Sequence, residues 1–438
     1  MTTKSYLDAS AGGSDDTADE RSCGTFVKSE SSWNLILAPS SATWQVGLPT
    51  LGSLPQSNSG WDSSAFDQTF LIMFRRPISG APRAKTVMVA ETACSFGFEK
   101  AKLRLASTAP RPDGGPSDHG PLMGVGITAD GLKIEKYRDV VNKYFKVLTP
   151  GNEMKWDHLE PQQGHFDFAA ANEIHDYAKQ NGKFLRIHTM FAKNQNPDWI
   201  KSGSIQPQDM KNAMSNILEK VISQYSDLAI GMDVCNEILN DQGNLDDQNP
   251  WLPKLGDNWV YGAFDAAKSI RDKYNKDMLL FINDFSIESI NPKSDGMLRL
   301  ATGLKNAGLL DAVGFQTHLI VNQVPPDFKQ NLERFTKAGL KVAITELDIR
   351  LPVTGQPPVA SQQDKDAQKN DYAKVFDICK SVDGCVSVTV WGVTYKDSWI
   401  ENDPQFYGYG EATLFDNDYN PTEAMQNLQS TYFSSTTH

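Results

Sequence analysis

Eight short apolar runs alternate with amphipathic segments of helical period through most of this 438-residue chain, and that alternation restricts the fold more than any other feature. Short continuous apolar runs are typical of parallel strands that are buried on both faces. The runs occupy residues 122–127, 146–149, 184–188, 230–234, 279–283, 312–316, 342–346 and 386–391. The helical patterns occupy residues 134–144, 169–180, 208–224, 260–274, 293–307, 328–338, 367–380 and 421–433. Eight strands alternating with helices predict an α/β fold, a (β/α)8 TIM barrel.

An open, doubly wound sheet is the alternative fold for this alternation. Its main signature is a Gly-X-Gly-X-X-Gly phosphate loop after a strand, where glycines let the backbone approach a dinucleotide closely. No such loop follows any of the eight runs. The closed barrel is therefore the predicted architecture.

Residues 1–118 have a different composition from the rest of the chain. Ser, Gly, Pro and Thr are frequent there, and no helical period is sustained. Residues 109–118 read Ala-Pro-Arg-Pro-Asp-Gly-Gly-Pro-Ser-Asp, which is typical of a flexible linker. We therefore predict an unassigned N-terminal segment, residues 1–118, that ends in this linker, and the barrel over residues 119–438. The first eight residues lack the apolar core of a signal peptide.

Composition and charge exclude several classes of function. The net charge of -12 and the sequence pI near 5.1 argue against nucleic acid and against an anionic membrane surface. No stretch is apolar over the length needed to span a bilayer. No His/Cys cluster suggests a metal, and we expect no cofactor. A neutral carbohydrate or glycoside substrate fits this balance, and we expect a monomer.

Polar and aromatic residues follow seven consecutive predicted strands. In a TIM barrel the carboxyl ends of the strands form the catalytic mouth, so these side chains are candidates for one site. They are Asn152, Lys155 and Trp156, His188, Asn236 and Glu237, Asn283 and Asp284, Gln316 and His318, Glu346 and Asp348, and Trp391 and Trp399. Any one of them could be a structural hydrogen-bonding residue, but packing alone hardly explains seven such strand ends.

Glu237 and Glu346 each end an apolar run and precede a loop. Burying an ionised carboxylate costs several kcal/mol unless the carboxylate has a partner. Either residue alone is most simply a salt-bridged acid at a strand end. Two carboxylates on strands around one mouth are also the minimum equipment for glycoside hydrolysis.

The region from about residue 120 to 430 resembles glycoside hydrolase family 10, which is best known for endo-β-1,4-xylanases and also includes fungal tomatinases. Two of the matching motifs are Asp-Val-Cys-Asn-Glu at 233–237 and Thr-Glu-Leu-Asp-Ile-Arg at 345–350. The others lie at residues 149–156 with 160–161, 282–284, 313–321, and 390–394 with 398–399. They follow the family's order and spacing. Residues 1–118 are outside the resemblance.

The resemblance implies a retaining glycoside hydrolase in which Glu237 is the general acid/base and Glu346 the nucleophile. Such a mechanism needs the two carboxyl groups about 5–5.5 Å apart. One must be protonated near neutral pH while the other is ionised, which mutual repulsion and different hydrogen-bond partners can achieve.

The same resemblance implies roles for eight further residues. His318 should hydrogen-bond Glu346, while Gln316 and Asn236 should hold the sugar and the intermediate. Trp391 and Trp399 should form aromatic walls, although packing at the barrel top is the simpler explanation for two tryptophans. The remaining substrate-binding candidates are Asn152, Lys155 and His188.

Cys379 and Cys385 are separated by five residues, between a predicted helix and the next strand. This spacing suits a disulfide, and it suits two reduced cysteines almost equally well. The pair corresponds to a disulfide position of the family. From the family and this candidate disulfide we expect a secreted protein.

The chain departs from the family mainly where the donor sugar would bind. Gly151 replaces a glutamate that binds a donor hydroxyl, Ala192 replaces a tryptophan, and Lys193 replaces a histidine. On the acceptor side, Phe285-Ser286 replaces Tyr-Asn. Losing an indole opens space and removes a stacking surface, while losing the carboxylate removes hydrogen bonds. The chemistry is expected to be preserved and the recognition changed.

Three functions are compatible with this pattern. The first is an endo-β-1,4-xylanase with altered donor subsites. The second is a tomatinase-like hydrolase that releases an oligosaccharide from a steroidal glycoalkaloid, for which Ala192 would free donor space and Phe285 would make the acceptor side more apolar. Gln195 and Trp399, which crowd a hydroxymethyl group in xylanases, count against it. The third is a non-catalytic carbohydrate-binding barrel, which would not need Glu237 and Glu346.

Overall fold

The computed structural model describes residues 121–433 and the backbone of seven short strands before them. Those strands form two antiparallel sheets, in the orders β1-β2-β3-β4 and β5-β6-β7. Their bounds are β1 (Tyr6–Asp8), β2 (Cys23–Ser29), β3 (Ser32–Leu37), β4 (Thr43–Val46), β5 (Thr69–Met73), β6 (Val87–Glu91) and β7 (Arg104–Leu105). The chain divides into two compact units, Met1–Pro110 and Arg111–His438. The predicted linker at 109–118 lies outside the described residues, so the domain boundary at residue 118 stays a prediction.

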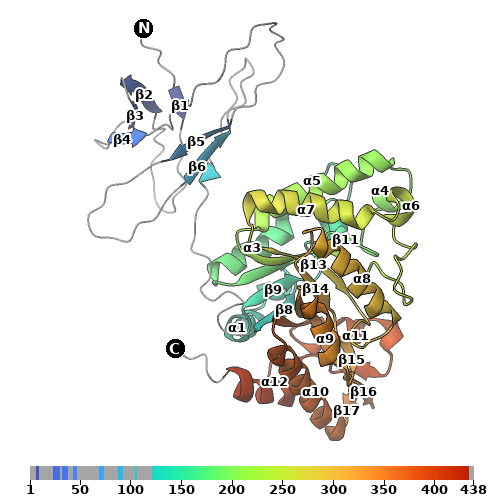
Figure 1. Cartoon of the computed structure of the whole chain (residues 1–438). Helices are drawn as coiled ribbons and strands as arrows, with labels where there is room; N and C mark the ends of the chain where they lie inside the picture. The colour runs from blue at the N-terminus through green and yellow to red at the C-terminus, as the bar shows by residue number, and fades with distance from the viewer. Residues whose placement is uncertain are drawn as a thin grey trace. The chain divides into compact units, whose positions relative to one another are not determined.

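Eight parallel strands close into a barrel in the second unit (Figure 1). They are β8 (Leu122–Ile127), β9 (Val147–Pro150), β10 (Phe184–Ile187), β12 (Ala229–Asn236), β13 (Leu279–Asp284), β14 (Ala312–Phe315), β16 (Lys341–Thr354) and β18 (Cys385–Val390). The order is that of the chain, and two pairings close the circle: β18 pairs with β8, and β10 pairs with β12. The predicted (β/α)8 TIM barrel is confirmed.

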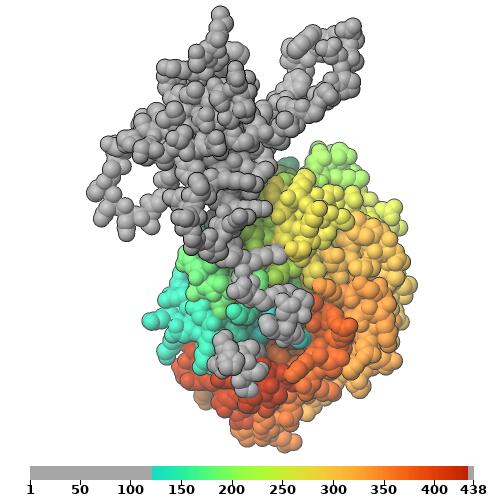
Figure 2. Space-filling view, turned by 60° about the vertical axis from the view of Figure 1, so that its left-hand side comes forward, coloured from blue at the N-terminus to red at the C-terminus, as the bar shows by residue number. Residues whose placement is uncertain are grey.

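Helices follow the strands and surround the barrel. They are α1 (Glu135–Tyr144), α3 (Ala169–Gln180), α5 (Pro207–Tyr225), α7 (Trp259–Tyr274), α8 (Pro292–Asn306), α9 (Phe328–Lys337), α10 (Gln362–Ser381) and α12 (Glu423–Leu428), which continues into η4 (Gln429–Phe433). In Figure 2 the teal surface of the first βα unit adjoins the red surface of the last, as closure of the barrel requires. The rings of Tyr144, in the first βα unit of the barrel, and Phe415, near the end of the last, are in contact, with centroids 5.3 Å apart.

Strand β16 is much longer than its predicted five residues. Leu347, Ile349 and Leu351 are fully buried and extend the strand beyond the barrel mouth. Three short strands pair with this extension, namely β15 (His318–Ile320), β17 (Val359–Ala360) and β19 (Tyr409–Gly410). The extension and its three partner strands thus lie beyond the barrel, on the side of the mouth where β16 ends.

Helix α10 begins five residues before the predicted start. The Oγ of Ser361 accepts a hydrogen bond from the backbone N of Asp364 and caps the helix. The first turn is polar, so hydrophobic period alone misses it, whereas the Ser-X-X-Asp cap is a sequence signal for this start.

Cys379, in the last turn of α10, and Cys385, the first residue of β18, form a disulfide with a Cα–Cα distance of 5.4 Å. The predicted pairing is confirmed, and it lies at the amino ends of the strands, away from the mouth. Among the described residues, no helix is long and apolar enough to cross a membrane.

Candidate active site

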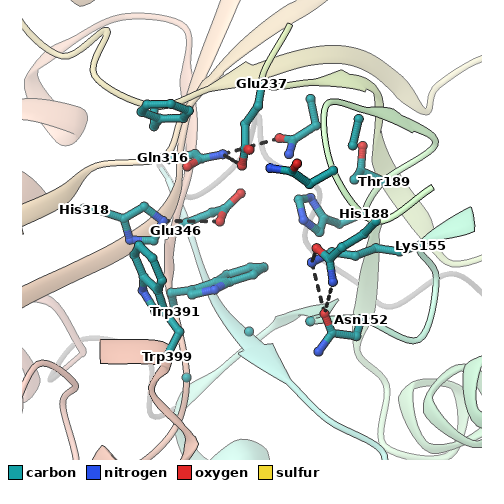
Figure 3. Close-up of a pocket in the computed structure, with 18 of the residues that line it drawn as sticks. Asn152, Lys155, His188, Thr189, Glu237, Gln316, His318, Glu346, Trp391 and Trp399 are labelled. Atoms are coloured by element: carbon teal, nitrogen blue, oxygen red, sulfur yellow. Dashed lines mark hydrogen bonds and ion pairs between the residues drawn. The ribbon is translucent and has the colours of Figure 1, made fainter. Parts of the chain in front are cut away.

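A cavity of about 850 Å³ opens at the carboxyl ends of the barrel strands. All ten predicted site residues line it, namely Asn152, Lys155, His188, Asn236, Glu237, Gln316, His318, Glu346, Trp391 and Trp399. Figure 3 shows His318, Glu346 and the two tryptophans facing Asn152 and Lys155 across the open centre. The fold thus brings these residues from six strand ends to one cavity.

Glu346 lies within β16, with 5% of its surface exposed. Its Oε1 accepts a hydrogen bond of 2.8 Å from the Nδ2 of Asn283, and its Oε2 lies 3.4 Å from the Nε2 of His318. The Nδ1 of His318 in turn lies 2.8 Å from Asp348, which also accepts the indole N–H of Trp399 at 2.8 Å. Both oxygens of Glu346 are therefore held by a buried network.

This network determines the charge of Glu346. Burial acts to raise its pKa, but the hydrogen bond from His318 and the positive charges of His188, His318 and Lys155 outweigh burial and lower it to about 2. Burial acts to lower the pKa of His318, but Asp348 and then Glu346 raise it to about 10. The cavity therefore holds an ionised carboxylate against a cationic imidazole.

Glu237 is more exposed than Glu346 and makes fewer contacts. It follows β12 in a left-handed backbone conformation, with φ of 57°, and its N–H donates to the carbonyl of Asn283 at 2.9 Å. Its Oε1 accepts a hydrogen bond of 2.9 Å from the Nε2 of Gln316. The turn presents the carboxyl group at the rim of the cavity, where Figure 3 shows it above Glu346.

A row of side-chain amides connects the two glutamates. The Oδ1 of Asn236 accepts from the Nδ2 of Asn283 at 2.8 Å and from the Nε2 of Gln316 at 3.4 Å. The same two amides donate to Glu346 and Glu237 respectively. The Oδ1 of Asn236 accepts from protein donors, and within residues 121–433 its Nδ2 makes no hydrogen bond, so this N–H group can donate to a ligand.

Asn283 reaches this position because Gly314 leaves room for it. A Cβ atom at residue 314 would lie 2.2 Å from the Oδ1 of Asn283, so the neighbouring strand has to carry glycine here. Thr345 then donates to the same Oδ1 at 2.7 Å. Asn283 was placed at a strand end by the sequence, but its contact with Glu346 depends on this pairing of β13 with β14.

The barrel interior beneath His188 is charged. Asp233 is fully buried, forms an ion pair with Arg186 and lies 3.0 Å from the Nδ1 of His188. Arg186 is stacked on the ring of Phe281, with 4.1 Å between the guanidinium and the ring centroid. This layer fixes the ring of His188, whose edge meets Trp391 at 5.4 Å between centroids.

Asn152 and Lys155, which face Glu346 and His318 across the cavity in Figure 3, form a small polar group with Gln195. The Nζ of Lys155 donates to the Oδ1 of Asn152 at 3.1 Å and to Gln195, whose Nε2 donates to Asn152 at 2.9 Å. Burial lowers the pKa of Lys155, while Glu346 and Glu237 oppose that effect.

The three departures on the donor side have different surroundings. A Cβ atom at Gly151 would come no closer than 3.4 Å to any heavy atom, the nearest being the carbonyl O of Ile127, so the site has free space beside it. Ala192 is 6% exposed and lines the cavity with its small side chain. The Nζ of Lys193 lies 2.7 Å from Asp246, so its charge is already paired.

Four of the residues placed at the mouth by the sequence do not line the cavity, namely Trp156, Asn283, Asp284 and Asp348. Trp156 is fully buried in α2 (Trp156–Leu159), stacked on Trp251 with centroids 5.6 Å apart, and does not line the cavity. Helix α2 turns this side chain into an aromatic cluster, which the strand-end argument does not account for. Asp284 is fully buried beneath the mouth rather than facing it.

Sequence reasoning missed Arg350 and Phe406 as lining residues. Arg350 lies two and four residues after Asp348 and Glu346, on the same face of β16, and strand alternation could have revealed it. Its guanidinium lies 5.0 Å from the ring centroid of Phe406, whose ring packs on Trp399 at 4.6 Å. Phe406 ends the short 3-10 helix η3 (Pro404–Phe406) and carries no such signal.

Comparisons with known proteins agree with this geometry. A family model described as glycosyl hydrolase family 10 matches residues 117–431. Endo-1,4-beta-xylanase A of Phanerodontia chrysosporium is 38% identical over 279 residues, which cover 64% of this chain and 65% of that protein. An endo-1,4-beta-xylanase of Agaricus bisporus is 37% identical over 287 residues, which cover 65% of this chain and 82% of that protein. Xylanase 10B from Thermotoga petrophila, solved in complex with xylobiose, has a TM-score of 0.66 and 31% identity, covering 71% of this chain and 93% of that one.

Proposed function

This chain belongs to glycosyl hydrolase family 10, and on that premise we propose that it is a retaining glycoside hydrolase that cleaves internal β-1,4-xylosidic bonds. The contrast between the two glutamates carries the proposal. Glu346 is buried, hydrogen-bonded at both oxygens and ionised, whereas Glu237 lies on an open turn with one hydrogen bond to its Oε1. A nucleophile and a general acid require these two environments respectively.

In the first step, Glu346 attacks the anomeric carbon while Glu237 donates its proton to the departing oxygen. The hydrogen bond from Gln316 to Oε1 fixes the carboxyl group of Glu237, leaving Oε2 to carry the proton. The Nδ2 of Asn236 is free to donate to a sugar hydroxyl beside the reacting carbon. Charge develops on the sugar ring, and the nearby Glu346 carboxylate stabilises it.

In the second step, water releases the sugar from Glu346. Esterification removes the charge of Glu346, so Glu237 can ionise and accept the proton of the attacking water. Water attacks from the side the leaving group has vacated, and the product therefore retains its anomeric configuration. His318 stays cationic beside Glu346 and favours its departure as a carboxylate.

We propose further that the donor subsites differ from those of xylanases. Gly151, with free space beside it, and Ala192, with its small side chain, supply neither the carboxylate nor the indole ring that the family has at these two positions. The ion pair of Lys193 with Asp246 means that the ammonium can donate to a ligand only with its remaining N–H bonds. Glu153 does not replace the missing carboxylate, because it accepts from the backbone N of Ala129 at 2.6 Å and does not line the cavity.

A tomatinase-like activity is the second candidate, and Phe285 favours it. This ring lines the cavity beside Glu237 and is 37% exposed, which suits an apolar aglycone. Gln195 and Trp399 weigh against it, because each is held in the cavity by hydrogen bonds, to Lys155 and Asp348 respectively. A non-catalytic binding barrel has no use for the network around Glu346.

A product profile decides among these functions. The enzyme is incubated with xylan, an aryl cellobioside and α-tomatine, and the products are identified by mass spectrometry. Release of xylo-oligosaccharides from xylan supports the proposal. Release of a tetrasaccharide from α-tomatine alone would favour the second candidate, and no turnover on any of them would favour a binding protein.

A further inference from the structure

A buried ion pair lies beneath the cavity, beside the turn that carries Glu237. Asp284, the last residue of β13, is fully buried, and Lys293, in the first turn of α8, is 2% exposed. The Nζ of Lys293 lies 2.8 Å from the Oδ1 of Asp284. Neither residue lines the cavity, and neither has a part in the mechanism above. Burying two charges this deeply is costly, so the contacts of the pair are informative.

Asp284 connects two loops of the mouth. Its Oδ2 accepts from the backbone N of Leu239 at 3.3 Å, and its Oδ1 accepts from the backbone N of Phe285 at 2.9 Å. Leu239 is two residues after Glu237, within the left-handed turn that presents the acid/base. One carboxylate thus ties the turn of Glu237 to the loop that carries the acceptor-side ring.

Lys293 supports that ring from below. Its Nζ lies 3.4 Å from the ring centroid of Phe285. Among the described residues, Nζ has no hydrogen-bond acceptor beyond its ion pair with Asp284. A desolvated ammonium against an aromatic face is held by a cation–π interaction. The position of Phe285 and the charge of Asp284 therefore depend on the same side chain.

The two charges also depend on each other. Burial raises the pKa of Asp284 to about 7, although Lys293 opposes the rise, and the charge of Glu237 adds to it. Without Lys293, Asp284 would take up a proton and accept the backbone N–H bonds more weakly. Other charged groups near the pair are Glu288, which accepts from the backbone N of Thr317, and Asp246, which is paired with Lys193.

We propose that Asp284 and Lys293 are positioning residues for the acid/base. Together they fix the turn of Glu237 and the ring of Phe285 relative to each other, so that Glu237 delivers its proton at the place where the acceptor sugar binds. This inference rests on the proposed role of Glu237. It assigns Asp284 and Lys293 no contact with substrate and no proton transfer of their own.

Leaving-group dependence tests the proposal. Asp284→Asn and Lys293→Met are compared with the wild type on aryl β-xylobiosides, from dinitrophenyl, which needs little protonation, to unactivated phenyl, and on xylo-oligosaccharides. We expect kcat/KM to fall about ten-fold or more on the unactivated substrates, part of the roughly 10²–10⁴-fold that a general acid supplies. On the dinitrophenyl substrate we expect a fall of less than about three-fold, because general-acid assistance is small there. The double variant should lose no more than the worse single one, because the pair acts as a unit.

A second ion pair in the same barrel is the matched control. Arg271 and Asp311 lie 2.6 Å apart at the amino ends of the strands, far from the mouth in the fold. Arg271→Met should lower the melting temperature and reduce kcat/KM equally on all leaving groups, if at all. Lys293→Met keeps the test valid if Asp284→Asn fails to fold, and calorimetry identifies the folded variants.

The outcomes separate the two claims. Equal losses on activated and unactivated substrates, in folded variants, would overturn the positioning role while leaving the proposed function intact. A wild type that hydrolyses no β-glycoside would overturn both, because Glu237 would then have no proton to deliver. A steeper leaving-group dependence in both Asp284→Asn and Lys293→Met, but not in Arg271→Met, supports the proposal.

Discussion

Two walls of the cavity are built on different principles. The strand wall comprises Gln316, His318, Glu346, Trp391 and Trp399. Glu346 lies in β16 and His318 in β15, Gln316 and Trp391 directly follow β14 and β18, and Trp399 begins α11 (Trp399–Asn402). A hydrogen-bond network holds Gln316, His318, Glu346 and Trp399. The loop wall comprises Gly151, Asn152, Lys155, Ala192 and Lys193, which come after β9 and β10 in the chain. Ala192 ends the two-residue strand β11 (Phe191–Ala192), which pairs with β12. The loop wall contains free space, a small side chain and an ion pair.

The difference shows how one fold can keep its chemistry and change its substrate. Groups that are held by several hydrogen-bond partners are fixed in place, so a change there disturbs the reaction itself. Groups on loops tolerate substitution, because fewer contacts depend on them. In this chain every departure from the family on the donor side falls on the loop wall, and the strand wall keeps the family's residues.

Replacing the nucleophile, a residue of the strand wall, should abolish the reaction entirely. Glu346→Ala is expected to abolish turnover of every glycoside, because no other carboxylate can form the covalent intermediate. Glu237→Ala should lose about 10²–10⁴-fold on unactivated substrates and largely spare the first step with activated aryl glycosides. Pre-steady-state kinetics on both substrate classes measure this. Early product anomers, followed by NMR, should retain their configuration, and inversion would exclude the mechanism.

Restoring the family's residues on the loop wall should change which substrate the enzyme prefers and leave the reaction mechanism unchanged. The triple variant Gly151→Glu, Ala192→Trp and Lys193→His is expected to raise kcat/KM on xylan by an amount equivalent to several kcal/mol of transition-state stabilisation in total. If the wild type hydrolyses α-tomatine, the same variant should lower kcat/KM on that substrate. An aromatic platform contributes about 1 kcal/mol beyond burial, and a hydrogen bond to a charged group about 1.5–3 kcal/mol. Each single variant is measured alongside, because neighbouring effects do not add. If the wild type already degrades xylan efficiently and the triple variant is no better, the donor side has drifted without changing specificity.

Replacing His318, a residue of the strand wall, should raise the pKa of Glu346. In His318→Gln, burial of Glu346 is no longer offset by the imidazole, so the pKa of Glu346 rises from about 2. The acidic limb of kcat/KM against pH is then expected to move to higher pH, since the nucleophile must be ionised. His175, which lies 2.8 Å from Asp227 and outside the cavity, provides the control. His175→Gln should leave the limb in place; a shift of equal size there would contradict the assignment.

Removing the disulfide should lower the stability of the barrel and leave both walls of the cavity, and therefore the activity, unchanged. The disulfide lies at the amino ends of the strands, opposite the mouth. The Cys379→Ser/Cys385→Ser double variant is expected to lose about 2 kcal/mol of unfolding free energy, because the closed loop is short. Calorimetry measures the stability, and kcat/KM on xylan should stay unchanged. A loss of activity in the folded variant would show that the two ends of the barrel are coupled.

The N-terminal segment should have the smallest effect. Residues 119–438 expressed alone are expected to fold and to keep the activity of the full chain, because the family model begins at residue 117. Cooperative melting and kcat/KM on xylan measure this. An insoluble product, or one without a cooperative melt, would place part of residues 1–118 within the barrel's own structure.

Periodicity was enough to predict the barrel and most of the extent of its helices. The strand-end rule and the family motifs together named ten residues that line the cavity, but the rule alone also named Trp156, Asn283, Asp284 and Asp348, which do not line it. Strands and helices leave a pattern in consecutive residues, and a TIM barrel brings all carboxyl ends of its strands to one face. The end of β16 was missed, because the strand continues where its partners are short strands from distant loops. The start of α10 was missed, because its first turn is polar and is fixed by the cap of Ser361.

The sequence by itself determined which residues lie at the carboxyl ends of the strands; only the tertiary structure decided which of them reach the cavity and what each of them contacts. Trp156 turns inward onto Trp251, Lys193 pairs with Asp246, and Asp284 lies beneath the mouth with Lys293. The spacing of residues along the chain encodes the face of a strand or helix, and therefore burial. Hydrogen bonds and ion pairs need atoms within about 3–4 Å, a separation set by how loops from different strands pack, and no local pattern records it.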